Sequence, residues 1–213
     1  LSHQSLQREN RAYREHLEAT NRELKLGLDE LRADQQAGRH AQLRMLPEPL
    51  SMGDVSCEHK LQPSLMLSGD FLDFMEVDDD RLAFYIADVS GHGASSAFVT
   101  VLLKNLTYRL KRNFQRGSSD DILKPDLVLA RINSELLASE LDKHLTMFYG
   151  VLTLSTGVLS YSVGGHFPMP VLISDGEAKF FEGRGMPVGL FKDAEYKSID
   201  VELAGDFRLM MFS

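Results

Sequence analysis

Three aspartates, Asp70, Asp73 and Asp88, lie in or at the ends of two apolar segments with strand-like composition. A carboxylate removed from water is costly unless a positive charge compensates it. Asp88 ends the run RLAFYIAD, and Val89 and the glycine turn SGHG follow it. Such a turn exposes backbone carbonyls beside the carboxylate. Mg²⁺ and Mn²⁺ prefer oxygen ligands of this kind. We therefore predict a metal site with Asp88 as its first ligand.

The spacing of Asp70 and Asp73 raises a geometric difficulty. Residues three apart on a straight strand point to opposite faces, so the two carboxylates share one ion only through a bulge or a bridging water. The alternative is a strand end with solvated acidic side chains, and the spacing alone does not decide between the two. The consecutive acids Asp78, Asp79 and Asp80 stand between two strand-like runs and predict a hairpin tip without a site role.

Two histidines and one cysteine are further candidates for reactive groups. His92 lies between two glycines, and His166 lies in the stretch GGHFPMP. Histidine titrates near physiological pH and can act as an acid, but both positions are also typical of turns, which we favour. For His166, the alternative interpretation is that it lines the same crevice as the aspartates. Cys57, the single cysteine, is predicted to be a packing thiol and not a nucleophile.

The elements that must position these residues alternate between strands and helices. Residues 94–114 have helical length and spacing, and a second helix is predicted over residues 126–141, after Pro125. From Thr146 onward the segments TMFYGVLTL, VLSYSV, MPVLIS, AKFFEG, YKSIDVEL and FRLMMF are strand-like and are joined by short turns. Short turns join antiparallel neighbours, so the pattern predicts an α+β sandwich and not a doubly wound parallel sheet.

The first 46 residues differ in composition from the rest. They contain no proline before Pro47 and are rich in Gln, Arg, Glu and Leu, which predicts a helix to about Arg44. Five residues of this helix follow each other at alternating intervals of four and three, as in the seam of a parallel two-stranded coiled coil. They are Leu17, Asn21, Leu24, Leu28 and Leu31. A single amphipathic helix lying on the next domain is the alternative. Pro47 and Pro49 mark the boundary, so we predict a coiled-coil segment at 1–46 and a globular domain at 47–213.

Composition restricts the partners. The net charge of -8 and the pI near 5.4 provide no basic field, so neither nucleic acid nor a membrane surface is predicted as a partner. No apolar run is long enough to span a bilayer, and Leu1 does not open a signal-peptide pattern. These features favour a cytoplasmic protein.

Four motifs, in order over residues 48–213, resemble one known family: SGDFLDF, YIADVSGHGASSAFV, GGHFPMPVLIS and GMPVGLF. They are similar to motifs of the bacterial metal-dependent serine/threonine phosphatases of the type 2C class (PPM), in the branch of the sporulation stage II E and RsbU phosphatases. The stretch QLRMLPEPL resembles the linker that precedes this domain in response-regulator phosphatases, and the helix before it is similar to their dimerisation element.

This resemblance implies an αββα sandwich of two antiparallel sheets flanked by helices, with two manganese or magnesium ions at one end. It assigns metal-ligand roles to Asp70, Asp88 and the Val89 carbonyl, while Asp73 matches the second acid of the first motif. In the family, the strand that FRLMMFS resembles runs into a Ser-Asp-Gly motif that supplies another metal ligand. The printed sequence stops at Ser213, so we expect a domain truncated at its C-terminal end, an incomplete site and a fragment of uncertain activity.

Two functional hypotheses follow from the resemblance. The first is a protein phosphatase in which water activated by the metals attacks phosphoserine or phosphothreonine, on a regulatory protein such as an anti-sigma factor antagonist. The second is a catalytically inactive, phosphatase-like adaptor that binds a sigma factor or anti-sigma protein. A degenerate domain is expected to lose its costly carboxylates first. Asp70 and Asp88 are both present, which favours the enzyme.

Overall fold

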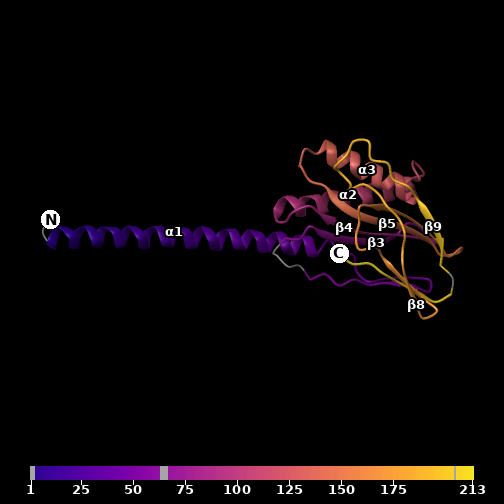
Figure 1. Ribbon diagram of the computed structural model, residues 1–213, viewed down its shortest axis with the longest axis horizontal. Coiled ribbons are helices and arrows are strands. Elements are labelled where there is room, and N and C mark those ends of the chain that lie inside the picture. The colour runs from indigo at the N-terminus through magenta and orange to yellow at the C-terminus, as the bar shows by residue number, and fades with distance from the viewer. Residues whose placement is uncertain (1–2, 63–66, 204) are drawn as a thin grey trace. The chain divides into compact units, whose positions relative to one another are not determined.

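The computed structural model describes residues 3–62, 67–203 and 205–213 (Figure 1). These residues fall into two compact units, at 1–40 and 41–213. None of the described helices combines the length and the apolar character that crossing a membrane requires.

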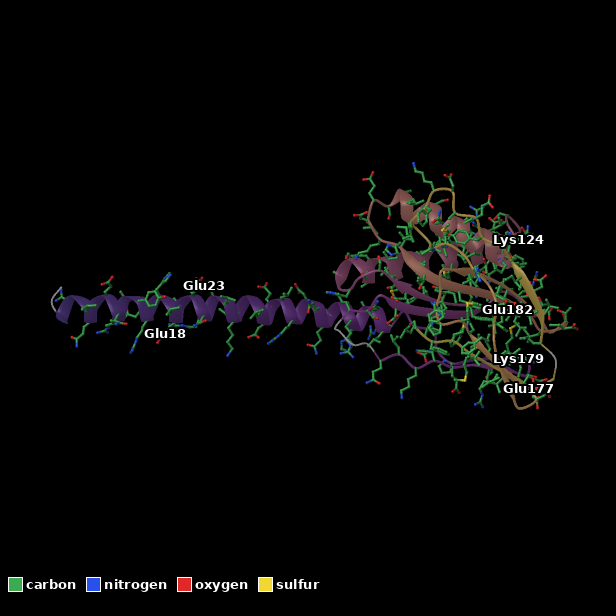
Figure 2. All side chains as sticks on the ribbon, viewed as in Figure 1. Glu18, Glu23, Lys124, Glu177, Lys179 and Glu182 are labelled. Atoms are coloured by element: carbon green, nitrogen blue, oxygen red, sulfur yellow. The ribbon has the colours of Figure 1, made fainter. Side chains whose placement is uncertain are left out.

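The first unit consists of helix α1 (His3–Leu43), whose last residues belong to the second unit. The predicted N-terminal helix is therefore confirmed for the described residues, and Leu1 and Ser2 lie outside them. Figure 2 shows side chains projecting from both sides of this helix, among them Glu18 and Glu23. The seam leucines Leu17, Leu24, Leu28 and Leu31 are exposed in the single chain. Pairing of two such helices remains a prediction.

Two antiparallel sheets form most of the second unit, as predicted. The larger sheet has the order β3 (Asp70–Glu76), β4 (Arg81–Val89), β5 (Leu145–Thr153), β6 (Val158–Gly164) and β9 (Ile199–Glu202). The smaller sheet has the order β10 (Phe207–Met210), β7 (Val171–Ser174) and β8 (Glu177–Phe180), and a short ribbon pairs β1 (Leu50–Met52) with β2 (Val55–Cys57). Every pair of these strands runs antiparallel.

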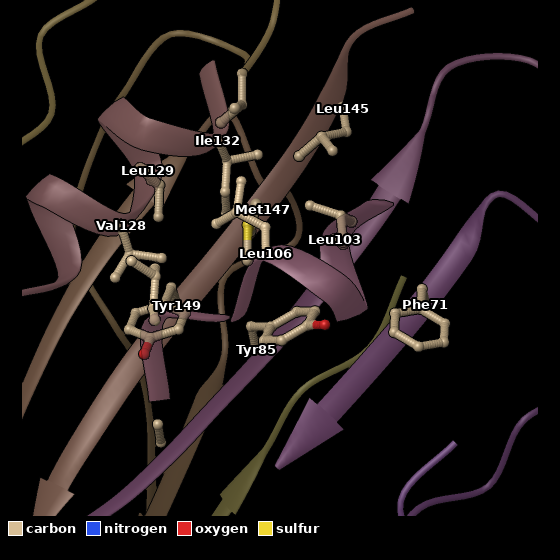
Figure 3. Close-up of a cluster of buried hydrophobic side chains, with 14 of the residues drawn as sticks. Phe71, Tyr85, Leu103, Leu106, Val128, Leu129, Ile132, Leu145, Met147 and Tyr149 are labelled. Carbon is tan, nitrogen blue, oxygen red and sulfur yellow. The ribbon is translucent and has the colours of Figure 1, made fainter. Parts of the chain in front are cut away.

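Two helices, α2 (Ala94–Gln115) and α3 (Pro125–Ala138), cover one face of the larger sheet, with the short 3-10 turn η1 (Asp121–Leu123) between them. Figure 3 shows Leu103 and Leu129 among the helix side chains that meet Tyr85 and Tyr149 of the sheet. Residues that alternate with these along the strands, such as Phe84 and Phe148, point to the other face of the larger sheet. They form a second apolar cluster with residues of the smaller sheet. The larger sheet is thus buried on both faces.

The layers are therefore helices, larger sheet and smaller sheet. The α+β class and the antiparallel sandwich are confirmed. The second helical layer of an αββα sandwich has no counterpart among the described helices of the second unit, which are α2, α3, the short η1 and the end of α1.

The hairpin tip predicted at Asp78 to Asp80 is also confirmed. Asp78, at the tip between β3 and β4, accepts hydrogen bonds from the backbone N–H groups of Asp80 and Arg81 and pairs with the Arg81 guanidinium. The stretch ISDGEAKFF forms the β7–β8 hairpin, in which Asp175 and Gly176 both have positive φ, as a two-residue turn of this kind requires. The Asp78 and Asp175 carboxylates thus belong to turns.

Candidate metal centre

Asp70 and Asp88 lie directly opposite each other at one end of the β3–β4 pair. Asp70 shares its face of the sheet with Leu72 and Phe74, and Asp88 shares the same face with Phe84 and Ile86. Opposite residues of an antiparallel pair bring their Cβ atoms to about 4.5–5.5 Å. The two carboxylates that the sequence proposed as ligands therefore share one small space.

The charges of this pair are not compensated by the protein. In the described structure neither carboxylate forms an ion pair with a lysine, arginine or histidine. The Asp70 carboxylate accepts hydrogen bonds from two neutral hydroxyls, that of Ser213 at 2.8 Å and that of Ser68 at 3.5 Å. Asp88 remains exposed, but partial desolvation raises the pKa of its carboxyl, and the charge of Asp70 raises it further. A cation between the two carboxylates would remove this repulsion.

The Val89 carbonyl lies against Gly69, the residue before Asp70, because Gly69 has no side chain. A Cβ added at Gly69 would lie 2.5 Å from the Val89 oxygen, which is closer than such atoms can approach. The Val89 N–H also donates to the Gly69 carbonyl at 3.2 Å. Gly69 therefore lets the two segments that carry Asp70 and Val89 approach closely.

The turn after Val89 is held by several hydrogen bonds. The Ser90 carbonyl accepts from Lys143 Nζ at 3.0 Å and from Ser96 Oγ at 3.1 Å, while the Ser90 N–H donates to the His144 carbonyl at 2.8 Å. His92 is exposed and lies between Gly91 and Gly93, whose φ angles are +77° and +85°. His92 thus occupies a turn position, as the sequence favoured.

The structure does not bring Asp73 to this site. Asp73 lies on the opposite face of β3, which is covered by helices, and both of its carboxylate oxygens accept hydrogen bonds from Lys104 Nζ at 2.7 Å. Its remaining exposure is 2%. Burial raises the pKa of Asp73, and Lys104 opposes that shift. The role of Asp73 as a metal ligand is therefore not supported, because the period of two along the strand separates it from Asp70.

His166 lies at the same end of the larger sheet. The preceding residue, Gly165, bridges to Met147, the neighbour of Thr146, and Thr146 lies opposite Asp88. The ring is buried, and neither nitrogen has a hydrogen-bond partner in the described structure. Burial lowers the pKa of His166, and the nearby Phe212 backbone offsets part of that shift. His166 is therefore a buried side chain at this end of the sheet, with a remaining exposure of 4%.

These donors fit a hard divalent cation. Two carboxylates and a carbonyl supply oxygen ligands, which Mg²⁺ and Mn²⁺ prefer, and both ions retain several waters in protein sites. The described residues contain no group of three or more His, Cys, Asp and Glu side chains placed to hold a metal. The set that the structure describes is thus suitable in chemistry and consists of two carboxylates and one carbonyl.

Several residues that contact the segments carrying Asp70 and Val89 were not predicted from the sequence. Lys104 is the one cation within the apolar run FVTVLLKNL, and that isolation is the signal that could have suggested a buried partner. Gln42, in the last turn of α1 and inside the second unit, donates to the Ser68 carbonyl and to Thr100. Nothing in the spacing of Gln42 or Lys143 indicates these contacts, which depend on the tertiary fold.

Comparison with known proteins assigns the chain to a family. Residues 78–213 match the family described as Stage II sporulation protein E (SpoIIE). The phosphoserine phosphatase RsbP of Bacillus subtilis (strain 168) is 27% identical over 180 residues, which cover 82% of this chain and 43% of RsbP. The chain spans less than half the length of the curated relatives that it matches.

Two solved structures share the fold. The SiaA-PP2C domain of Pseudomonas aeruginosa superposes with a TM-score of 0.65 at 17% identity, over 86% of this chain and 71% of that domain. RsbX, solved in complex with magnesium, gives a TM-score of 0.51 at 17% identity, over 76% of this chain and 69% of RsbX. The family match covers more than half of the sequence and includes Asp88 and the turn that follows it, so the chain belongs to the SpoIIE family.

Proposed function

We propose that this chain is the catalytic part of a metal-dependent protein serine/threonine phosphatase. The observation that carries the proposal is the uncompensated pair of Asp70 and Asp88, held opposite each other at one end of the larger sheet. A protein keeps two adjacent carboxylates without a basic partner at a cost, and that cost is offset when a cation binds. RsbP, its relative, is named a phosphoserine phosphatase.

The residues of the chain would act by holding two divalent cations, manganese or magnesium, and by orienting what binds to them. Asp70 and Asp88 supply the negative charge, and the Val89 carbonyl adds a neutral oxygen. Bound cations would lower the pKa of water from ~15.7 towards ~7 and neutralise phosphate oxygens. This chemistry uses no side-chain nucleophile, which agrees with a site of carboxylates. The magnesium in the RsbX structure supports this choice of ion.

The substrate that we propose is a phosphoserine or phosphothreonine on a regulatory protein, such as an anti-sigma factor antagonist. RsbP and RsbU, which are both named phosphoserine phosphatases, support the chemical class. We also propose a cytoplasmic homodimer that pairs through the exposed leucine seam of α1.

The test is the release of inorganic phosphate from a phosphoserine-containing regulatory protein by the full-length protein, with Mn²⁺ and with a chelator. Turnover is expected to require Mn²⁺ and to fall by at least about 100-fold in Asp88→Asn, because a ligand to the activating ion is lost. Asp79→Asn, which removes a carboxylate from the β3–β4 hairpin tip, is the control and should keep wild-type turnover. Metal-independent turnover, or unchanged turnover in Asp88→Asn, would reject the enzyme. Absence of turnover together with retained binding of a regulatory protein would favour the adaptor.

A further inference from the structure

Three polar residues of α2 lie on one stripe of the helix and point into the protein. Ser96, Thr100 and Lys104 follow each other at intervals of four, so they share a face. Ser96 and Thr100 are fully buried, and Lys104 is partly buried. The same helix buries Val99, Leu103, Leu106, Leu110 and Thr107, and polar side chains buried among them require specific partners.

Each member of this stripe, directly or through Gln42, contacts a segment that carries a proposed metal ligand. Ser96 donates to the carbonyl of Ser90, the residue after Val89. Thr100 accepts from Gln42, whose amide also donates to the Ser68 carbonyl at 2.7 Å and accepts from the Ser68 N–H at 3.1 Å. Ser68 in turn accepts from the backbone N–H of Asp70 at 3.0 Å.

The third contact has the strongest geometry. Lys104 donates to both oxygens of Asp73 at 2.7 Å, and Asp73 also accepts from the Phe74 N–H at 3.1 Å. Asp73 lies three residues after Asp70 on the same strand. A charge-assisted pair of this kind, with one partner almost fully buried, restricts the position of the strand relative to the helix.

We propose that Lys104 is a positioning residue for the metal site, and that Asp73 is its anchor and not a ligand. Through Asp73, Lys104 holds β3 and therefore Asp70 against α2. The first turn of the same helix, through the Ser96 hydroxyl, holds the Ser90 carbonyl and with it the segment that carries Val89. One helix thus contacts both halves of the ligand set and supports the geometry that the β3–β4 pairing establishes. Metal sites tolerate deviations of only about 0.2 Å in ligand distance, so loosening this contact should weaken metal binding.

This inference rests on the proposed function, and its test uses Mn²⁺ alone so that activity is not the only readout. The dissociation constant for Mn²⁺ is measured by titration calorimetry on the folded protein, well below the thermal midpoint of each variant. Lys104→Met is expected to weaken Mn²⁺ binding by about tenfold or more, as loss of a supporting contact typically does. Lys111→Met is the matched control, because Lys111 lies on the same helix near Asp73 without a hydrogen bond to it. It should stay within about twofold of wild type.

A second variant addresses folding, since Lys104→Met leaves a buried carboxylate unpaired. Asp73→Asn with Lys104→Gln keeps a neutral hydrogen-bonded pair and removes both charges. It should fold and still bind Mn²⁺ more weakly than wild type. If either variant is folded and binds Mn²⁺ as wild type does, the positioning role is overturned and the pair is structural only. If Asp88→Asn leaves wild-type Mn²⁺ binding unchanged, the proposed site itself is wrong, which distinguishes the two failures.

Discussion

Asp70 on β3 lies directly opposite Asp88 on β4, and in the described structure no basic side chain pairs with either carboxylate. Like charges in directly opposite positions destabilise a sheet. The arrangement therefore lowers the stability of the metal-free protein and prepares the same end of the sheet for a cation.

The first prediction concerns that cost. With a chelator present, Asp88→Asn should be more stable than wild type at pH 7 by about 0.5 kcal/mol, the usual size of an exposed charge interaction. Because the pKa of Asp88 is raised in the folded state, the favourable protonated form is fully present below the unfolded pKa of about 3.9. That contribution is lost as the pH rises through the folded pKa. Denaturant unfolding between about pH 4 and pH 7 should show the gap widening with pH, and a constant gap would contradict this account.

A second prediction uses Gly69. Gly69→Ala would place a Cβ 2.5 Å from the Val89 oxygen, so the backbone around Val89 must shift. We expect a loss of about 1–3 kcal/mol in the free energy of unfolding and weaker Mn²⁺ binding. Gly27→Ala is the control, because Gly27 lies in α1 with nothing within 4 Å. It should stabilise the helix by about 0.5–1 kcal/mol and leave Mn²⁺ binding unchanged. Wild-type Mn²⁺ affinity in Gly69→Ala would argue against a role for the Val89 carbonyl.

The fold was largely predictable from the sequence because its local signals agree. Apolar runs of strand-like composition predicted β3 and β4, and Pro125 marked the start of α3. The period of two along a strand also predicted that Asp70 and Asp73 point to opposite faces, as the structure shows, whereas the resemblance only matched Asp73 to the second acid of its first motif. The partner of Asp73 could not be predicted, because residues 73 and 104 meet only after a helix packs on the sheet.

A third prediction concerns pH and His166. The pKa of this buried histidine is lowered, so the neutral ring is favoured in the folded state. The stability that it contributes is present above the unfolded pKa of about 6.5 and is lost as the pH falls through the folded pKa. Unfolding of wild type should therefore become easier as the pH falls below about 6.5, and His166→Gln should show less of this dependence. Equal pH profiles for the two proteins would indicate that His166 does not titrate on unfolding.

A fourth prediction tests the leucine seam of α1. Leu24 belongs to the seam, whereas Leu26 lies outside it, and both side chains are exposed in the single chain. Leu24→Lys should shift the protein from dimer to monomer in sedimentation velocity at micromolar concentrations, while Leu26→Lys should remain dimeric. A dimer that persists in Leu24→Lys would place the interface elsewhere.

The most direct test of the central claim is the location of bound Mn²⁺. Backbone amide signals of the isotope-labelled protein are followed by nuclear magnetic resonance during a Mn²⁺ titration, because the paramagnetic ion broadens signals close to it. The signals of Asp70, Asp88 and Val89 are expected to broaden first, and Asp88→Asn is expected to abolish this effect at the same Mn²⁺ concentration. Broadening centred on another acidic cluster, such as Asp78 to Asp80, or unchanged broadening at Asp70 and Val89 in Asp88→Asn, would contradict this claim.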